Sequence, residues 1–165
     1  AEILKNKNQQ MLIHVLKQLR EKGKDAYLLL PGPNHQHGEY QKIADDLGLH
    51  DYVKFLGWRS DIGQLMVASD ICVASSIREG FGINLVEAQY CHLPVVAVSN
   101  RGHRAIIKDG VNGFLVPLND CDAMTNKIIS LMNDRLLYMK LSSVNVDEYK
   151  AEYVANQIYC FLKSL

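Results

Sequence analysis

The sequence predicts an α/β protein whose parallel sheet of five to six strands carries helices on both faces. Segments with a helical spacing of apolar residues alternate with short strand-like segments, which is typical of a parallel sheet with helical crossovers. The strand-like segments are apolar throughout rather than at every second position, as expected of strands that are buried on both faces. Residues 1–165 are expected to form a single domain of this kind.

The first elements follow from apolar spacing and from glycine or proline boundaries. Residues 8–22 place five apolar side chains on one helix face, and a glycine follows them. Residues 26–30 form an apolar run that ends at Pro31, which predicts a buried strand. A short helix is expected at 38–48 and a strand at 52–56, each closed by a glycine.

The alternation of helices and strands continues to the end of the chain. A helix is expected after a cap at Ser60 or Asp61, and a strand at 71–74. The remaining elements are expected as a helix from near Gly82 to about Cys91, a strand at 94–98, a helix at 103–108, a strand at 114–116, and helices near 120–133, 134–142 and 147–165.

The composition argues against several classes of partner. The 18 basic residues balance the 18 acidic residues, so a nucleic-acid surface is not indicated. No apolar run reaches the roughly 20 residues of a membrane span, and no signal peptide is recognisable. The four cysteines form no CxxC pair, and we interpret them as reduced thiols of a cytoplasmic protein. His35 and His37 lack further ligands nearby, so no metal site is expected.

One loop at a predicted strand end has an unusual composition. Ligands of open parallel sheets bind at the carboxyl ends of the strands, and the sequence REGFGINLVEA at 78–88 follows such a strand. A helix is expected to open near Gly82, and its first N–H groups and dipole favour an anion. Gly80 and Gly82 would let a phosphate approach the backbone, with the N–H groups of Gly82, Ile83 and Asn84 as candidate donors.

Two carboxylates flank this turn. Glu87 falls in the second helical turn, and because helix side chains lean toward the N-terminus, its carboxylate is expected to accept the two hydroxyls of a ribose. Glu79 lies on the other side and could accept hydroxyls of a sugar, while Phe81 stands between the two glycines. The spacing matches a nucleoside–diphosphate–sugar. A plain strand-to-helix turn with an acid near a helix start explains the same stretch.

The segment EGFGINLVEAQYCHLPVVAVSNRGHRAIIKDGVNGFLVP resembles the nucleotide-sugar-binding, C-terminal domain of retaining glycosyltransferases with the GT-B fold, family 4 type (glycosyl transferases group 1). The pattern is a glutamate, seven residues and a second glutamate, then a Leu-Pro strand and an Asn-Gly turn. KFLGW and GQLMVASDICVASS match the elements before it, so the resemblance runs from about Lys7 to Leu141. It implies that this chain is one Rossmann-like half of a GT-B fold.

The resemblance implies roles for three residues. Glu87 would bind the ribose and Glu79 would lie against the donor sugar, while Lys7 would neutralise the phosphates and the charge that develops on the leaving diphosphate. The family has an arginine five or six residues before this lysine, whereas Ala1 and Glu2 stand here. The first strand of the sheet is also nearly absent. Residue 1 is not Met, so we expect the chain to be part of a longer protein.

Other strand-end loops supply further candidates for donor binding. Gly32 in PGPN could allow a close backbone approach, Trp58 and Arg59 could flank the base, and Arg101 in NRGHR could face phosphate or sugar. For each of these residues, a turn or packing role is an open alternative.

The resemblance also implies a reaction. A hexosyl group would pass from a UDP- or GDP-sugar to a glycan or lipid-linked acceptor by front-side attack, with no metal or other cofactor. The acceptor would dock on an N-terminal Rossmann domain that this chain lacks, so we expect the chain alone to bind nucleotide weakly and to transfer no sugar. The expected process is cell-surface polysaccharide synthesis. The expected location is the cytoplasm, and for the full-length protein the inner face of the membrane is an open alternative.

Two alternatives to the transferase stand beside it: a nucleotide-sugar epimerase of the same architecture, and a nucleotide-binding module without chemistry. The last predicted helix carries an apolar side that is expected to pack on the missing domain or on its own sheet; this side consists of Val154, Ile158, Phe161, Leu162 and Leu165.

Overall fold

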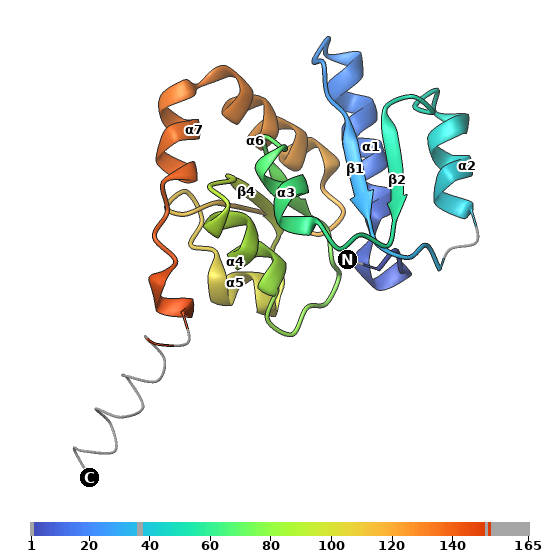
Figure 1. Ribbon diagram of the computed structural model, residues 1–165. Coiled ribbons are helices and arrows are strands. Elements are labelled where there is room, and N and C mark those ends of the chain that lie inside the picture. Colours follow the sequence, from blue (N-terminus) through green and yellow to red (C-terminus); the bar gives the residue numbers. More distant parts are fainter. Residues whose placement is uncertain (1, 36–37, 151, 153–165) are drawn as a thin grey trace, which may run out of the picture.

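The structure is a computed structural model that describes residues 2–35, 38–150 and 152 (Figure 1). Helices and strands alternate as the sequence predicts. In chain order the elements are η1 (Lys5–Lys7), α1 (Gln9–Glu21), β1 (Leu28–Pro31), α2 (Glu39–Asp46), β2 (Val53–Gly57), α3 (Ile62–Val67), β3 (Cys72–Ala74), α4 (Ile83–Tyr90), β4 (Val95–Val98), α5 (Arg101–Ile106), β5 (Phe114–Val116), α6 (Cys121–Asn133), α7 (Arg135–Ser142) and η2 (Asp147–Tyr149).

The strand pairings are parallel, which confirms the predicted α/β class, but the strands form two sheets. β1 pairs with β2, with Leu28 opposite Val53. The second sheet has the order β3–β4–β5, and Cys72 lies opposite Val95. No ladder joins β1 to β3 within the residues that the structure describes. The expected single sheet is therefore interrupted at this point, because no described strand lies between β1 and β3.

The central strand of the second sheet is buried on both faces. All four residues of β4 are fully buried. Val96 and Val98 belong to the cluster formed with α1 and α6, whereas Val95 and Ala97 belong to the cluster formed with α4 and α5. Successive side chains of a strand point to opposite faces, so the unbroken apolar run of this strand follows from helices on both sides.

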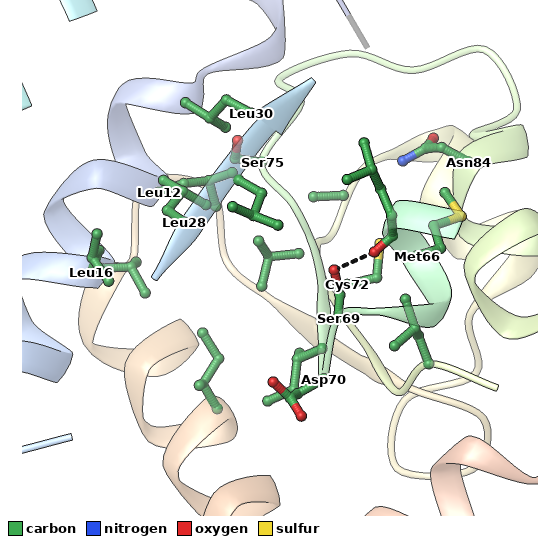
Figure 2. Close-up of a pocket in the computed structure, with 18 of the residues that line it drawn as sticks. Leu12, Leu16, Leu28, Leu30, Met66, Ser69, Asp70, Cys72, Ser75 and Asn84 are labelled. Atoms are coloured by element: carbon green, nitrogen blue, oxygen red, sulfur yellow. Dashed lines mark hydrogen bonds between the residues drawn. The ribbon is translucent and has the colours of Figure 1, made fainter. Parts of the chain in front are cut away.

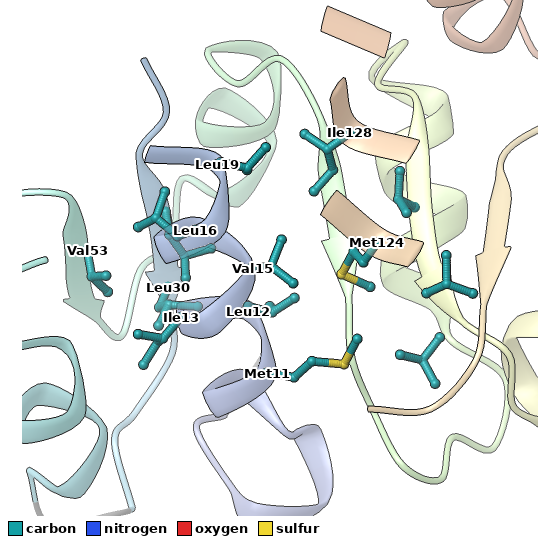
Figure 3. Close-up of a cluster of buried hydrophobic side chains, with 14 of the residues drawn as sticks. Met11, Leu12, Ile13, Val15, Leu16, Leu19, Leu30, Val53, Met124 and Ile128 are labelled. Atoms are coloured by element: carbon teal, nitrogen blue, oxygen red, sulfur yellow. The ribbon is translucent and has the colours of Figure 1, made fainter. Parts of the chain in front are cut away.

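Helix α1 connects the two sheets. It lies between the β1–β2 sheet and α6, and it packs along α6 (Figure 3). Ile13 and Leu16 lie toward Leu30 and Val53 of one sheet, while Val15 lies toward α6 (Figure 3). The predicted apolar face of this helix is thus wide enough to contact both halves of the molecule.

Two predicted details differ from the structure. Helix α5 begins at Arg101 rather than 103, because Asn100 Oδ1 accepts the N–H of His103 and caps the helix there. Asp61 occupies the cap position of α3, but its carboxylate pairs with Arg59 instead of capping the helix.

Only the beginning of the last predicted helix falls among the described residues. Residues 147–149 form a short 3-10 turn there. The proposed packing of its apolar side, 154–165, lies outside the described residues. Within the described part of the chain, no helix is both long enough and apolar enough to cross a bilayer.

Candidate functional site

The loop after β3 and the start of α4 line one end of a cavity of about 1420 Å³, which continues between β1 and β3 (Figure 2). Most of the residues singled out by the sequence meet here. The predicted site residues that line this cavity are Lys7, Glu79, Phe81, Gly82, Ile83, Asn84 and Glu87.

The start of α4 offers backbone donors to the cavity. Gly82 holds a φ of 85°, a left-handed conformation that favours glycine, and it turns the chain into the helix. The N–H of Leu85 donates to the carbonyl of Gly82 at 2.9 Å. Ile83 and Asn84 precede it in the first turn, where N–H groups have no partner within the helix. These two N–H groups and the helix dipole together favour a bound anion.

Lys7 and Glu79 form an ion pair at the same end of the cavity. The Nζ of Lys7 lies 2.6 Å from Oε2 of Glu79, and Ser76 Oγ donates to that oxygen at 3.3 Å. Burial raises the pKa of the Glu79 carboxyl, but the hydrogen bond and charge of Lys7, with the Ser76 hydroxyl and the Gly80 N–H, outweigh it and hold this pKa below its ordinary value. Glu79 is therefore a carboxylate at neutral pH.

The N-terminal segment is bonded to the loop after β3. Asn6 accepts the N–H of Ile77 on its carbonyl at 2.8 Å, and its side-chain Nδ2 donates to the carbonyl of Arg78 at 2.9 Å. The hydroxyl of Ser75 donates to the carbonyl of Lys7 at 2.8 Å. These bonds place Lys7 beside a loop that is about seventy residues away in the sequence.

Helix α5 supports the same loop from the other side. An ideal Cβ at Gly102 would lie only 2.6 Å from the carbonyl oxygen of Glu79, so only glycine allows this backbone contact. The Nδ2 of Asn100 donates to the carbonyl of Ser76 at 2.9 Å. The sequence leaves open whether NRGHR faces the ligand or forms a helix entry, and it does not predict this supporting role; the glycine inside the helix is the available signal.

His103 is a buried polar residue that sequence reasoning also missed. Its Nδ1 lies 2.7 Å from the carbonyl of Val98, which identifies Nδ1 as the protonated nitrogen. Burial lowers the pKa of His103, so the ring is neutral at neutral pH. Its Cδ2 would be 3.1 Å from a Cβ on Gly82, and its Nε2 has no hydrogen-bond partner in the described part of the structure.

Glu87 and Phe81, which also line the cavity, differ in their exposure and in their contacts. Glu87 is exposed on the second turn of α4, four residues after Ile83. Phe81 is half exposed, and its ring meets that of Tyr149 edge to face at 6.0 Å between centroids.

Five predicted site residues do not line the cavity, and one of them is Gly80, in the loop between Glu79 and Phe81. Trp58 is 75% exposed. Arg59 forms a bidentate ion pair with Asp61, in which its Nε and Nη2 donate to the two carboxylate oxygens at 2.8 and 2.6 Å. Gly32 is buried and donates its N–H to the carbonyl of Gly57 at 2.7 Å, so it acts as part of a turn. Arg101 is exposed at the start of α5. Within residues 2–35, 38–150 and 152, His, Cys, Asp and Glu side chains form no group of three that could hold a metal ion.

Comparisons of the sequence with known proteins all point to the same family. The sequence profile of the family described as glycosyl transferases group 1 matches residues 1–146. EpsD of Bacillus subtilis (strain 168), which is named as a glycosyltransferase, is 42% identical over 141 residues, which cover 86% of this chain and 37% of EpsD. The lipopolysaccharide core biosynthesis glycosyltransferase LpsE of Rhizobium meliloti (strain 1021) is 31% identical over 117 residues, covering 71% of this chain and 34% of LpsE.

The fold agrees with a solved structure of similar sequence. The crystal structure of Anabaena HepE (Alr3699) in complex with UDP and glucose matches with a TM-score of 0.86 and 30% identity, covering 100% of this chain and 47% of HepE. The chain thus spans less than half the length of these relatives. The chain belongs to the glycosyl transferases group 1 family and corresponds to one half, the C-terminal sugar-donor-binding domain, of a GT-B glycosyltransferase.

Proposed function

We propose that this domain binds a UDP- or GDP-linked hexose, with the diphosphate at the start of α4. The observation that carries the proposal is the cavity that gathers Lys7, Glu79 and Glu87 around the first N–H groups of α4. The helix start attracts a dianion. An ammonium group has three N–H donors, and the bond to Glu79 leaves two of those of Lys7 for phosphate oxygens.

In this proposal, the two glutamates bind the uncharged parts of the donor, which are the ribose and the hexose. Glu87, exposed on the second turn, accepts the ribose hydroxyls, and Glu79 accepts hydroxyls of the hexose. Gly80 and Phe81 complete the turn between them. Crystal structures of Anabaena HepE, described as complexes with UDP and glucose and with UDP-glucose, support a donor of this class.

In the whole protein, we propose retaining transfer of the hexose to a glycan or lipid-linked acceptor of cell-surface polysaccharide synthesis, on the cytoplasmic side. The name of the relative LpsE supports this process. Lys7 would offset the charge that develops on the leaving diphosphate, without a metal. Because the acceptor would dock on a second domain, the present chain is proposed to bind donor without transferring sugar.

The substitution Glu87→Ala tests the ribose contact. Loss of a hydrogen bond to a charged group costs about 1.5–3 kcal/mol, so UDP or GDP affinity should fall about 10- to 100-fold, as measured by isothermal calorimetry in EDTA. Glu39→Ala is the matched control, because Glu39 is an exposed glutamate in the first turn of α2 and does not line the cavity.

Equal nucleotide affinities for the Glu87→Ala and Glu39→Ala variants would contradict the ribose assignment. Binding that disappears in EDTA would contradict the metal-free mode. A panel of nucleotide sugars, with the products separated by chromatography, distinguishes a transferase from an epimerase in the full-length protein.

A further inference from the structure

His103 packs against the first turn of α4 without lining the cavity. Its side chain is fully buried. A Cβ built on Gly82 would lie 3.1 Å from Cδ2 of His103 and 3.5 Å from Cγ of Glu79. Both side chains therefore meet the residue that turns the chain into α4, and the imidazole ring is a close neighbour of the proposed diphosphate site.

The orientation of this ring is fixed by hydrogen bonds. Nδ1 of His103 lies 2.7 Å from the carbonyl of Val98 at the end of β4, and the N–H of His103 donates to Oδ1 of Asn100 at 2.9 Å. Because Nδ1 carries the hydrogen, Nε2 carries a lone pair. Nε2 is bonded to Cδ2, the ring atom that meets Gly82, so the lone pair lies next to the turn before α4.

This lone pair has no partner among the residues that the structure describes. Buried polar atoms of proteins nearly always form a hydrogen bond, and leaving one without a partner lowers stability. An apolar side chain at this position would fill the space without that loss. The unpaired nitrogen therefore indicates a group that is used in a second state of the site.

The ionised side chains at this end of the cavity have an excess of negative charge. Lys7 carries one positive charge and is already paired with Glu79 at 2.6 Å, while Glu87 adds a second carboxylate. Under the donor proposal, the diphosphate brings two further negative charges to the same place. A helix N-terminus supplies only about half an elementary positive charge, so binding would be helped by another cation close to this turn.

His103 is neutral before a ligand binds, but its surroundings allow that to change. Burial lowers the pKa of His103 and Lys7 lowers it further, whereas the carbonyl bonded to Nδ1 and the carboxylate of Glu79 raise it. The charged side chains on its own helix, Arg101 and Arg104, are exposed. A dianion at the start of α4 adds negative charge next to the ring, and a nearby opposite charge favours the charged form of a group.

We propose that His103 is a positioning residue for the donor diphosphate: its Nε2 takes up a proton from solvent when the diphosphate binds, and the imidazolium offsets the charge of the diphosphate from beside Gly82. The inference rests on the donor proposal and extends it to a residue that does not line the cavity. Because the complex holds one proton more than the free protein, donor affinity increases as pH falls through the pKa of His103 in the complex, and the gain is complete below its pKa in the free protein.

Nuclear magnetic resonance tests the proposal on the unchanged chain by following the ring of His103 through a pH titration, with and without UDP-glucose or GDP-glucose. The diphosphate of these donors is a diester that gains no proton near neutral pH, so a change in bound protons comes from the protein. Saturating donor should raise the pKa of His103 by at least about one. Calorimetry in buffers of different ionisation enthalpy should show the uptake of protons on binding.

The variant His103→Asn tests the consequence for binding, because asparagine keeps an N–H donor but does not titrate. A pKa rise of one corresponds to a tenfold change in affinity, so the native chain should bind UDP-glucose about 10-fold more tightly at about pH 5 than at about pH 8. The affinity of His103→Asn should change much less over this range. His50→Asn is the matched control, because His50 is an exposed histidine that pairs with Asp45 and does not line the cavity.

Each negative result has its own meaning. Donor binding with an unchanged pKa of His103 overturns this inference and leaves the donor proposal in place. The same is true if His103→Asn and His50→Asn show equal pH profiles of affinity. If His103→Asn does not fold, the titration of the native chain decides. Absence of binding by both UDP-glucose and GDP-glucose overturns the donor proposal and this inference together.

Discussion

At the scale of single residues, the Lys7–Glu79 pair shows how a charge is positioned before any ligand arrives. The two side chains are 25% and 19% exposed, so water screens their attraction only in part. Seventy-two positions separate them, and the bonds of Asn6 and Ser75 bring them together. The pair therefore couples the N-terminal segment to the loop after β3.

A double-mutant cycle with Lys7→Met and Glu79→Gln should give a coupling of about 1 kcal/mol at pH 7, measured by urea unfolding. The pKa of Glu79 is lowered in the folded state, so its contribution is fully present above the ordinary value of 4.5 and is lost as pH falls through the folded pKa. The difference in free energy of unfolding between the native chain and the Glu79→Gln variant should therefore shrink below about pH 4.5. A coupling that stays constant down to pH 2.5 would refute the assignment.

At the scale of elements, α5 determines the shape of the loop that precedes α4. Gly102 touches the backbone of Glu79 and Phe81, where a Cβ would lie 2.6 Å and 3.0 Å from backbone atoms. Neither contact atom is the end of a flexible side chain, so the loop itself would have to move. The close fit of this helix thus holds the carboxylate and the start of α4 in place.

Gly102→Ala should destabilise the protein by about 1–3 kcal/mol through overpacking and should weaken UDP binding. Gly63→Ala is the matched control, since Gly63 lies in α3 with no atom within 4 Å of its Cβ position; alanine there should stabilise by about 0.5–1 kcal/mol. Both are measured by thermal unfolding and calorimetry. The idea fails if Gly102→Ala is as stable as Gly63→Ala.

At the scale of the whole molecule, one apolar cluster holds the two sheets together through α1 and α6 (Figure 3). Met124 of α6 is fully buried in it, beside Val15 of α1. Because this cluster includes residues of both sheets, both halves should lose their structure in one transition.

Met124→Ala should lower the free energy of unfolding by about 2–5 kcal/mol, since it removes a buried side chain and leaves a cavity. Met139→Ala is the control, because Met139 of α7 is 52% exposed; its effect should stay within about 0.5 kcal/mol. Urea unfolding by circular dichroism measures both changes. The rates of amide hydrogen exchange in β1 and β4 should rise together in the Met124→Ala variant. Faster exchange in one sheet alone would contradict a shared core.

The order and kind of the elements were readable from the sequence, because apolar spacing and glycine or proline boundaries act over a few residues. The same holds for Glu79 and Glu87, which lie eight positions apart around one turn and both line the cavity. Tertiary structure alone decided which distant groups meet: the bond of Lys7 to Glu79, the contact of Gly102 with the loop, and the exclusion of Trp58 from the cavity. It also decided that the sheet is open between β1 and β3. These features depend on how whole helices and strands pack, and no local pattern of residues carries that information.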